Sequence, residues 1–295
     1  MTNRGTVYTE IEMFHPIRGY EFSYQSAKYD GIILPAHRHN FCEFVYIFSG
    51  TGTHTIEGSK RIMSAGDLYI LNEGVMHEME GTKDLQFLNV MYRRDGMFRF
   101  SRDIRKLPAF HTLFEIPPSY YNRADESIAY PGYVSFSNGG KERLESLFAR
   151  IERELDSQLP GFETEVLALF MQTIVHICRT FESSAEWNRN VSRAAAQTAA
   201  YIEANFSSKI TVGKLCAAAG VQKSALYEQF QRFYGSTPFE YLTAIRLQKA
   251  ASYLQGGNDP IKQIAPRCGF EDVNYFTRMF RKHYRLPPGR FRRER

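Results

Sequence analysis

The sequence has no apolar run close to the length of about 20 residues that a membrane-spanning helix needs, so we expect no membrane span. Residues 1–20 carry charges and lack the apolar core of a secretion signal, which predicts a cytoplasmic protein. Cysteine is scarce, and its spacing fits neither a zinc finger nor a disulfide-rich scaffold. We expect four reduced, packed thiols: Cys42, Cys178, Cys216 and Cys268.

The composition is otherwise that of an ordinary globular protein, with 43% hydrophobic residues, 23% charged residues, 21 Gly and 12 Pro among 295 positions. Collagen-like and disordered chains depart strongly from these proportions. Since domains usually contain about 100–150 residues, the length predicts two domains.

Charge is distributed unevenly between the two halves. Residues 191–295 contain 17 Lys/Arg and 7 Asp/Glu, a net charge of +10, whereas residues 1–190 contain 20 and 25, a net charge of −5. A small basic domain attracts polyanions and gains affinity by releasing their condensed counterions. A solvated basic face is the alternative, and the placement of the charges on helices has to decide between them.

Residues from about 5 to 95 have the pattern of a small β-domain. Short runs rich in aromatic and β-branched residues alternate with turn signals at Ser49-Gly50, Glu57-Gly58, Ala65-Gly66 and Glu73-Gly74. Many short strands at even spacing predict a sandwich or barrel. The expected strands are 41–48, 53–57, 67–71 and 85–92, and residues 96–137 receive no firm assignment.

The pattern changes to a helical period at Gly140. Apolar stripes within 144–155 and 166–181 predict an antiparallel helix pair, which packs on the β-domain or against a second subunit. The predicted fold is therefore α+β with two domains. Residues 1–137 form the β-domain, residues 138–190 the helical hairpin and a linker at 182–190, and residues 191–295 an all-helical domain.

The helical domain contains the same pattern twice. A short helix with small apolar residues is followed by a glycine, Gly220 or Gly269, and then by a longer helix with polar and basic residues. Such a turn lets the second helix enter a major groove. Two copies 49 residues apart favour paired helix-turn-helix units over an ordinary helical bundle. The pairs are 212–219 with 222–234, and 261–268 with 271–284.

Residues 192–292 resemble the DNA-binding domain of the AraC/XylS family of bacterial transcription regulators. The similarity rests on Ile264-Ala265, Cys268-Gly269-Phe270, the run Tyr275–Lys282, and Tyr284, Pro288 and Arg290. It implies two helix-turn-helix units joined by a rigid helix and reading two successive major-groove faces. Pro266 departs from the family pattern and is expected at most to shift the start of its helix.

The resemblance also implies which residues contact double-stranded promoter DNA. The base-reading positions carry over to Ser224, Tyr227 and Glu228 in the first unit and to Asn274, Thr277 and Arg278 in the second. Asn can pair with adenine, Arg with guanine, and Glu can accept from cytosine. Phosphate contacts, which set the register on the duplex, are expected from Lys223, Arg232, Arg281 and Lys282.

The β-domain contains a cluster of histidines. His37, His39 and Glu43 lie two and four positions apart, so on one strand they would share a face. A neighbouring strand could bring His77 to them. Three imidazoles and a carboxylate would suit Zn, Fe, Mn or Ni. The spacing resembles the two cupin motifs, except at Asn72 and Gly81, and implies a cupin-like barrel.

Two interpretations of this cluster stay open. In cupin enzymes the four residues hold a catalytic metal, whereas in sugar-sensing regulators the same barrel mouth is a ligand pocket that is often free of metal. His and carboxylate groups also suit the hydroxyls of a small sugar or polyol, and aromatic rings can stack on its apolar faces. The aromatic candidates are Phe41, Tyr46 and Tyr92.

The whole chain is similar to AraC-family activators of sugar catabolism, and the segments 37–43 and 88–93 look most like the rhamnose-responsive branch. The resemblance implies a homodimeric activator that works with RNA polymerase and is not an enzyme. The alternatives are a metal-dependent cupin enzyme with a helical appendage and a repressor without ligand control. No catalytic base or nucleophile is evident beyond the histidine and glutamate residues of the cluster.

Overall fold

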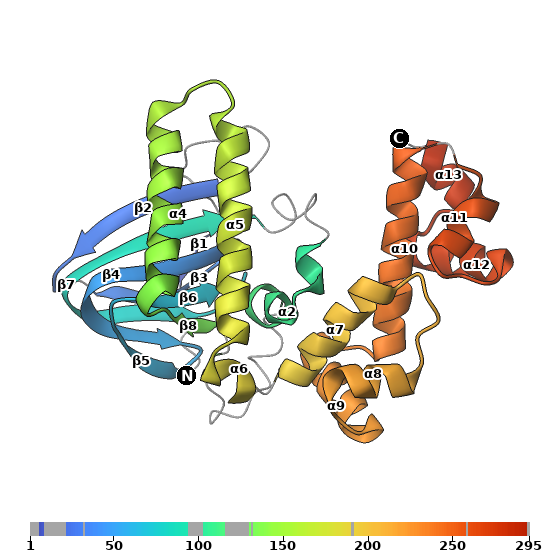
Figure 1. Ribbon diagram of the computed structural model, residues 1–295, viewed down its shortest axis with the longest axis horizontal. Helices are drawn as coiled ribbons and strands as arrows, with labels where there is room; N and C mark the ends of the chain where they lie inside the picture. The colour runs from blue at the N-terminus through green and yellow to red at the C-terminus, as the bar shows by residue number, and fades with distance from the viewer. Residues whose placement is uncertain are drawn as a thin grey trace. The chain divides into compact units, whose positions relative to one another are not determined.

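The computed structural model describes residues 6–8, 22–31, 33–93, 103–115, 130, 132–189, 192–257 and 259–293. The chain divides into two compact units, Met1–Val191 and Ser192–Arg295, and each is described by itself (Figure 1). Across these described ranges, no helix combines the length and the apolarity that crossing a membrane requires. The expectation that residues 1–20 contain no secretion signal concerns a segment of which only residues 6–8 lie within the described ranges.

The first unit contains an eight-stranded sheet among its described residues, in the order β1-β3-β7-β4-β6-β8, with β2 paired to β7 and β5 to β4. The β1–β3 pair is parallel and the other pairs are antiparallel. The strands are β1 (Thr6–Tyr8), β2 (Phe22–Tyr29), β3 (Leu34–His39), β4 (Cys42–Ile56), β5 (Ser59–Met63), β6 (Asp67–Leu71), β7 (His77–Tyr92) and β8 (Tyr133–Ser135). This sheet confirms the predicted β-domain.

Two expected strands, 41–48 and 53–57, are one continuous strand, β4. The turn expected at Ser49-Gly50 is therefore wrong. The pairing of β4 with β7 shifts irregularly between Ile47 and Thr53, so an irregular, bulged stretch replaces the turn. A bulge inserts a residue without ending the strand. The β4–β5 turn at Glu57-Gly58 and the strand at 67–71 agree with expectation.

The two faces of β4 pack against different partners because neighbouring side chains on a strand point to opposite sides. Val45 and Ile47 belong to an apolar cluster on the inner face of the sheet. Phe44 and Tyr46 point to the other face, where the helical hairpin lies. The Phe44 ring stacks on Phe170 with a centroid distance of 6.0 Å.

The hairpin consists of α4 (Asn138–Ser157) and α5 (Phe162–Glu182), which run antiparallel across one face of the sheet (Figure 1). Short elements described within 96–137 are η1 (Ile104–Lys106), α2 (Pro108–Phe114) and β8. Residues 182–190 were expected as a linker, but they include α6 (Ala185–Arg189). Trp187 in α6 is buried against Phe181, with ring centroids 5.7 Å apart, so this segment is packed rather than free.

The second unit is helical throughout its described residues. Its helices are α7 (Arg193–Asn205), α8 (Val212–Ala219), α9 (Lys223–Tyr234), α10 (Pro238–Gly256), α11 (Ile261–Arg267), α12 (Val273–Tyr284) and α13 (Pro288–Arg293). The long helix α10 is shared between two cores. Its Leu242 packs with α7–α9, whereas its Leu254 packs with α11–α13. One helix therefore fixes the two halves of this unit to each other (Figure 1).

Pro266 lies inside α11 and does not shift its start, contrary to expectation. The helix begins at Ile261, so Pro266 lies past the first turn, where it removes one backbone donor. The helix ends one residue later, at Arg267. The amide of Cys268 then donates to the Ile264 carbonyl and closes the last turn.

Candidate functional site

The amphipathic helix α12 has one buried and one exposed face. It begins where the Asp272 carboxylate accepts a hydrogen bond from the Tyr275 amide at 2.6 Å, a side-chain cap of the first turn. Phe276 and Phe280 are fully buried on one face. The opposite face exposes Asn274 and Arg278 to solvent. This exposure is what the predicted base-reading role requires.

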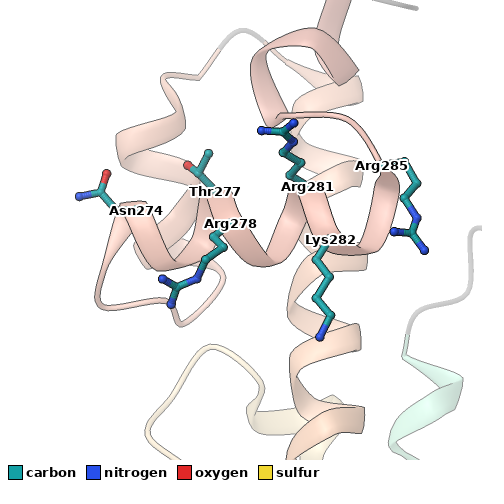
Figure 2. A pocket seen from close by; sticks show the side chains of 6 residues that line it. All are labelled: Asn274, Thr277, Arg278, Arg281, Lys282 and Arg285. Atoms are coloured by element: carbon teal, nitrogen blue, oxygen red, sulfur yellow. The ribbon is translucent and has the colours of Figure 1, made fainter.

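A surface hollow of about 650 Å³ extends along the exposed face of α12. Figure 2 shows the side chains that project from the helix around it. Four of them are cations, and no acidic residue occurs between Val273 and Arg285. Arg285 was not among the expected contact residues; it directly follows the last residue of α12, in a left-handed conformation with a φ of 62°, and its side chain lines the same hollow. The lining residues are Asn274, Thr277, Arg278, Arg281, Lys282 and Arg285.

Thr277 is less available to a base than its neighbours. Its side chain is half-buried, and its hydroxyl donates to the Val273 carbonyl at 2.9 Å within the same helix. The hydroxyl proton is thus already used. The exposed Tyr275 ring lies beside the same face, with the Arg278 guanidinium 5.4 Å from its centroid.

The corresponding helix of the first pair, α9, carries a mixed charge. Ser224, Glu228 and Arg232 are exposed, and so is Lys223 at the start of the helix. Tyr227 is half-buried and packs against the apolar cluster of α7–α10. Its ring is therefore partly committed to the interior, and its hydroxyl is the part that can reach a partner.

The two turns of the duplicated motif differ in how tightly they are packed. Gly220 and Gly269 both have positive φ, 66° and 83°. A Cβ at Gly220 would meet nothing within 4 Å, whereas a Cβ at Gly269 would lie 2.7 Å from the Phe206 carbonyl oxygen. Arg246 of α10 donates to this same oxygen at 2.7 Å and to Ser208 O at 2.9 Å. The second turn thus lies against the α7–α8 connection of the first pair.

In the first unit, three strands bring a histidine cluster together. His39 ends β3, Glu43 lies at the start of β4, and His77 begins β7. His39 Nε2 is 2.6 Å from Glu43 Oε2, and His77 Nε2 is 3.6 Å from the same oxygen. All three residues are buried, and their ligand atoms lie within 4.8 Å of one another. The chain turns between His39 and Glu43, so these residues meet across a connection rather than along one strand.

His37 lies at the edge of this group. It pairs with His77 across β3 and β7, with ring centroids 4.1 Å apart, but it is only half-buried. The group whose atoms could surround one ion consists of His39, Glu43 and His77. His37 is therefore a neighbour of the trio in this structure.

Backbone carbonyls fix which nitrogen carries the proton in two of the rings. His39 Nδ1 is 2.7 Å from Phe41 O, and His37 Nδ1 is 2.8 Å from Pro35 O. A carbonyl oxygen can only accept, so each Nδ1 must donate. When its ring is neutral, His37 therefore keeps a lone pair on Nε2. His39 Nε2 also faces an acceptor, the Glu43 carboxylate, so without an ion His39 donates from both nitrogens, and a bound metal would take the place of the Nε2 proton.

The charge state of the cluster follows from burial and from one short hydrogen bond. Burial would raise the pKa of Glu43, but the hydrogen bond with His39 and the neighbouring imidazoles lower the pKa to about 2. Burial lowers the pKa of His39, yet Glu43 outweighs it and the pKa is raised. Burial holds the pKa of His77 well below its usual value. The site therefore offers a carboxylate and a neutral imidazole.

These residues fit a divalent metal ion. His77 Nε2 is buried without a hydrogen-bond partner and lies on the Glu43 side of its ring. A buried lone pair facing a carboxylate is unfavourable unless a cation or a proton lies between them. Two imidazoles and one carboxylate are a common ligand set for catalytic zinc and related metals. The trio could hold such an ion.

The three aromatic candidates lie in different places. Phe41 stacks on the His39 ring, with centroids 4.2 Å apart and planes 7° apart. Tyr46 lies on the other face of β4 and donates to Glu145 of α4 at 2.9 Å. Tyr92 also faces the hairpin, where its ring contacts Phe170. The structure thus places Tyr46 and Tyr92 away from the cluster, contrary to the expectation that they line it.

His54 lies outside the motifs that indicated the cluster, but its ring lies beside the cluster. His54 Nε2 is 3.3 Å from His77 Nδ1, and the residue is fully buried. His54 lies eleven positions after Glu43, an odd offset that predicts opposite faces of a regular strand. The irregular pairing between Ile47 and Thr53 reverses this alternation. Gly50, with a φ of 81°, lies within that stretch, and a glycine inside a strand is a signal for a bulge, but it does not indicate which way the later side chains point.

The architecture defines a class of protein: a β-sheet unit with a buried polar cluster, joined to a helical unit with paired helix-turn-helix motifs. The family described as "AraC-like ligand binding domain" matches residues 19–174, and the family described as "Helix-turn-helix domain" matches residues 215–294. The chain belongs to the AraC family of transcriptional regulators with an AraC-like ligand-binding domain. It is a regulator with a DNA-binding and a ligand-binding domain, not an enzyme.

Relatives resemble the chain over most of its length. The "HTH-type transcriptional activator RhaS" of Escherichia fergusonii is 28% identical over 262 residues, which cover 89% of this chain and 88% of the relative. RhaS of Klebsiella pneumoniae is also 28% identical, covering 86% of each chain. Among solved structures, a probable AraC family transcriptional regulator from Rhodopseudomonas palustris is 32% identical, covers 34% of this chain and 95% of its own, and has a TM-score of 0.33.

Proposed function

We propose that the protein activates promoters of carbohydrate catabolism genes in response to a small sugar bound in the first unit, with rhamnose as the leading candidate. The observation that carries the DNA-binding half is the exposed, acid-free face of α12, with Asn274 and Arg278 in solvent. The sugar is supported by the RhaS relatives, which are 26–28% identical. His37, His39, Glu43 and His77, with Phe41, are the residues proposed to bind it.

The proposed base-reading roles are those that the family resemblance implies, and the exposure of the two helix faces supports them. Asn274 and Arg278 project from the first turns of α12, where a side chain reaches base edges when a helix end enters the major groove. Ser224, Tyr227 and Glu228 take the equivalent place on α9, and Thr277 contributes its methyl group. Lys223, Arg232, Arg281 and Lys282 bind phosphates, and Arg285 extends their row.

Arg278 provides the test of sequence reading. In Arg278→Ala we expect specific binding to weaken by about 1–3 kcal/mol with relaxed base preference, because a bidentate contact to guanine is lost. Titration of specific and scrambled duplexes at fixed salt measures both effects. An equal loss on both duplexes would reassign Arg278 to a phosphate.

The remaining partners are a second copy of the chain and RNA polymerase. A homodimer through the hairpin is supported by half-buried apolar side chains at four-residue spacing on α5: Leu167, Met171 and Val175. Such a stripe suits a helix that meets a second subunit. Sedimentation analysis of wild type and of Met171→Glu tests it, since a buried charge at the interface would favour the monomer.

The effector is identified by thermal denaturation against a panel of sugars. A ligand that binds only the native state raises the melting temperature by mass action. L-rhamnose should stabilise the protein more than arabinose, xylose or glucose. A panel in which none of the sugars shifts the transition contradicts the sugar-binding half of the proposal and leaves the DNA-binding half intact.

A second candidate ligand is a divalent metal ion held by His39, Glu43 and His77. It is supported by His77 Nε2, which is buried without a hydrogen-bond partner. His37 would become a fourth ligand after a movement of its side chain. The metal would serve as a structural or sensed ion. Elemental analysis of purified protein measures the stoichiometry, and Glu43→Gln should abolish binding because it removes the anionic ligand. Metal-free protein that binds sugar with unchanged affinity after Zn(II) addition would contradict it.

A further inference from the structure

A fourth imidazole, His54, adjoins the metal-binding trio on the side away from Glu43. It lies on β4 next to the first residue of β7, with its Nε2 3.3 Å from His77 Nδ1. It is fully buried, and the Tyr69 ring meets it edge-on with a centroid distance of 4.6 Å. His54 cannot rotate freely in this setting, so its contact with His77 is a fixed feature of the core.

A hydrogen bond between the two nitrogens needs a proton on one of them and a lone pair on the other. The tautomer of one ring therefore determines the tautomer of the other. Both rings are buried, and burial disfavours the charged form of an imidazole, so the pair is considered with each ring neutral. If His54 Nε2–H donates, then His77 carries its proton on Nε2, which faces Glu43. If His77 Nδ1–H donates, then His77 Nε2 has a free lone pair.

Only the second arrangement lets His77 bind a metal through the nitrogen that faces Glu43. In either arrangement His54 Nδ1 is buried without a hydrogen-bond partner, so this atom does not favour one over the other. His39 has the equivalent device, because its Nδ1 donates to the Phe41 carbonyl. His54 would therefore accept the Nδ1 proton of His77, as the Phe41 carbonyl accepts the Nδ1 proton of His39.

We propose that His54 is a positioning residue for metal binding: it accepts the Nδ1 proton of His77 and thereby presents the His77 Nε2 lone pair to an ion shared with His39 and Glu43. The inference rests on the proposed metal binding at that trio. Outer groups that orient a metal-ligating histidine typically change metal affinity 10- to 100-fold when they are removed. Because His54 does not touch the ion, its loss should weaken binding without changing the ligand set.

The experiment measures Zn(II) and Co(II) affinity of the full chain, stripped with a chelator, for wild type, His54→Leu and His54→Gln. We expect His54→Leu to bind Zn(II) 10- to 100-fold more weakly. His54→Gln should recover most of the affinity, because its amide oxygen can accept from His77. Tyr69→Phe keeps the ring against His54 and serves as the control with unchanged affinity.

The outcomes separate the two claims. If wild type binds neither ion, the metal-binding proposal fails, and the inference fails with it. If wild type binds and His54→Leu binds equally well, only the role of His54 is overturned. Nitrogen-15 spectra of the histidine rings decide the matter even if His54→Leu does not fold. In zinc-loaded wild type His77 must carry its proton on Nδ1, and a proton on Nε2 would contradict the inference.

Discussion

The two helix-turn-helix pairs have the same plan but differ in charge and in packing. The exposed face of α12 presents four cations and no acid, whereas α9 combines Lys223 and Arg232 with Glu228. The turn before α12 is packed against Phe206 and Arg246, whereas the turn before α9 is open. The difference indicates that the turn of the second pair is the more tightly packed, and under the proposed function it predicts that α12 is attracted to phosphate more strongly than α9.

The largest effect is expected at the turn glycines. Gly220→Ala should cost roughly 1–2 kcal/mol, the penalty for a left-handed conformation. Gly269→Ala should cost a further 1–3 kcal/mol, because its Cβ would overlap the Phe206 carbonyl oxygen. Urea unfolding followed by far-ultraviolet circular dichroism measures the difference.

The chain provides an internal control for this comparison. Its one tryptophan, Trp187, is buried in the first unit, so its fluorescence reports on that unit alone. The fluorescence transition should stay where it is in both glycine variants. Equal destabilisation of the helical signal by the two variants would show that the close approach at Gly269 has no energetic consequence.

The next effect concerns the helix caps. Asp272 caps α12 through a hydrogen bond, whereas Gln222, at the same place before α9, makes no such bond. Asp272→Ala should lower the free energy of unfolding by about 1 kcal/mol, and Gln222→Ala should leave it nearly unchanged. Thermal unfolding of the two variants under the same conditions measures both losses of stability. A larger loss in Gln222→Ala than in Asp272→Ala would contradict the expectation that α12 is the more firmly capped of the two helices.

The smallest effect distinguishes the charges of the two helices. Arg281→Gln should weaken binding to specific and scrambled duplexes alike and reduce the slope of log K against log salt by about 1. Glu228→Gln should instead strengthen binding to the scrambled duplex, because it removes the single acid of α9. Salt titrations by fluorescence anisotropy measure both. A Glu228→Gln variant that loses affinity for every duplex would contradict the assignment of α9.

The sequence predicted most of the helical unit because its signals are local. The turns between the paired helices follow from Gly220 and Gly269, which reverse the chain within a few positions. The exposed face of α12 follows from helical period alone. Pro266 is the exception, since its place within α11 depends on where the chain starts the helix and not on the proline itself.

The β-sheet unit was less predictable because its site depends on pairing between distant strands. The spacing of His39, Glu43 and His77 indicated the trio, but the contribution of His54 depends on a shift in the pairing of β4 with β7. Tyr46 was predictable in principle, because it lies three positions from Glu43 and so on the opposite face of a strand. The buried α6, in place of a free linker, depends on the contact of Trp187 with Phe181.

The most direct test is hydroxyl-radical footprinting of the protein on its promoter, with wild type and Arg278→Ala compared. The account predicts two protected patches on one face of the duplex, about 10 base pairs apart, and loss of one patch in the variant. Protection of a single patch, or of none, would contradict the claim that α9 and α12 enter successive major grooves.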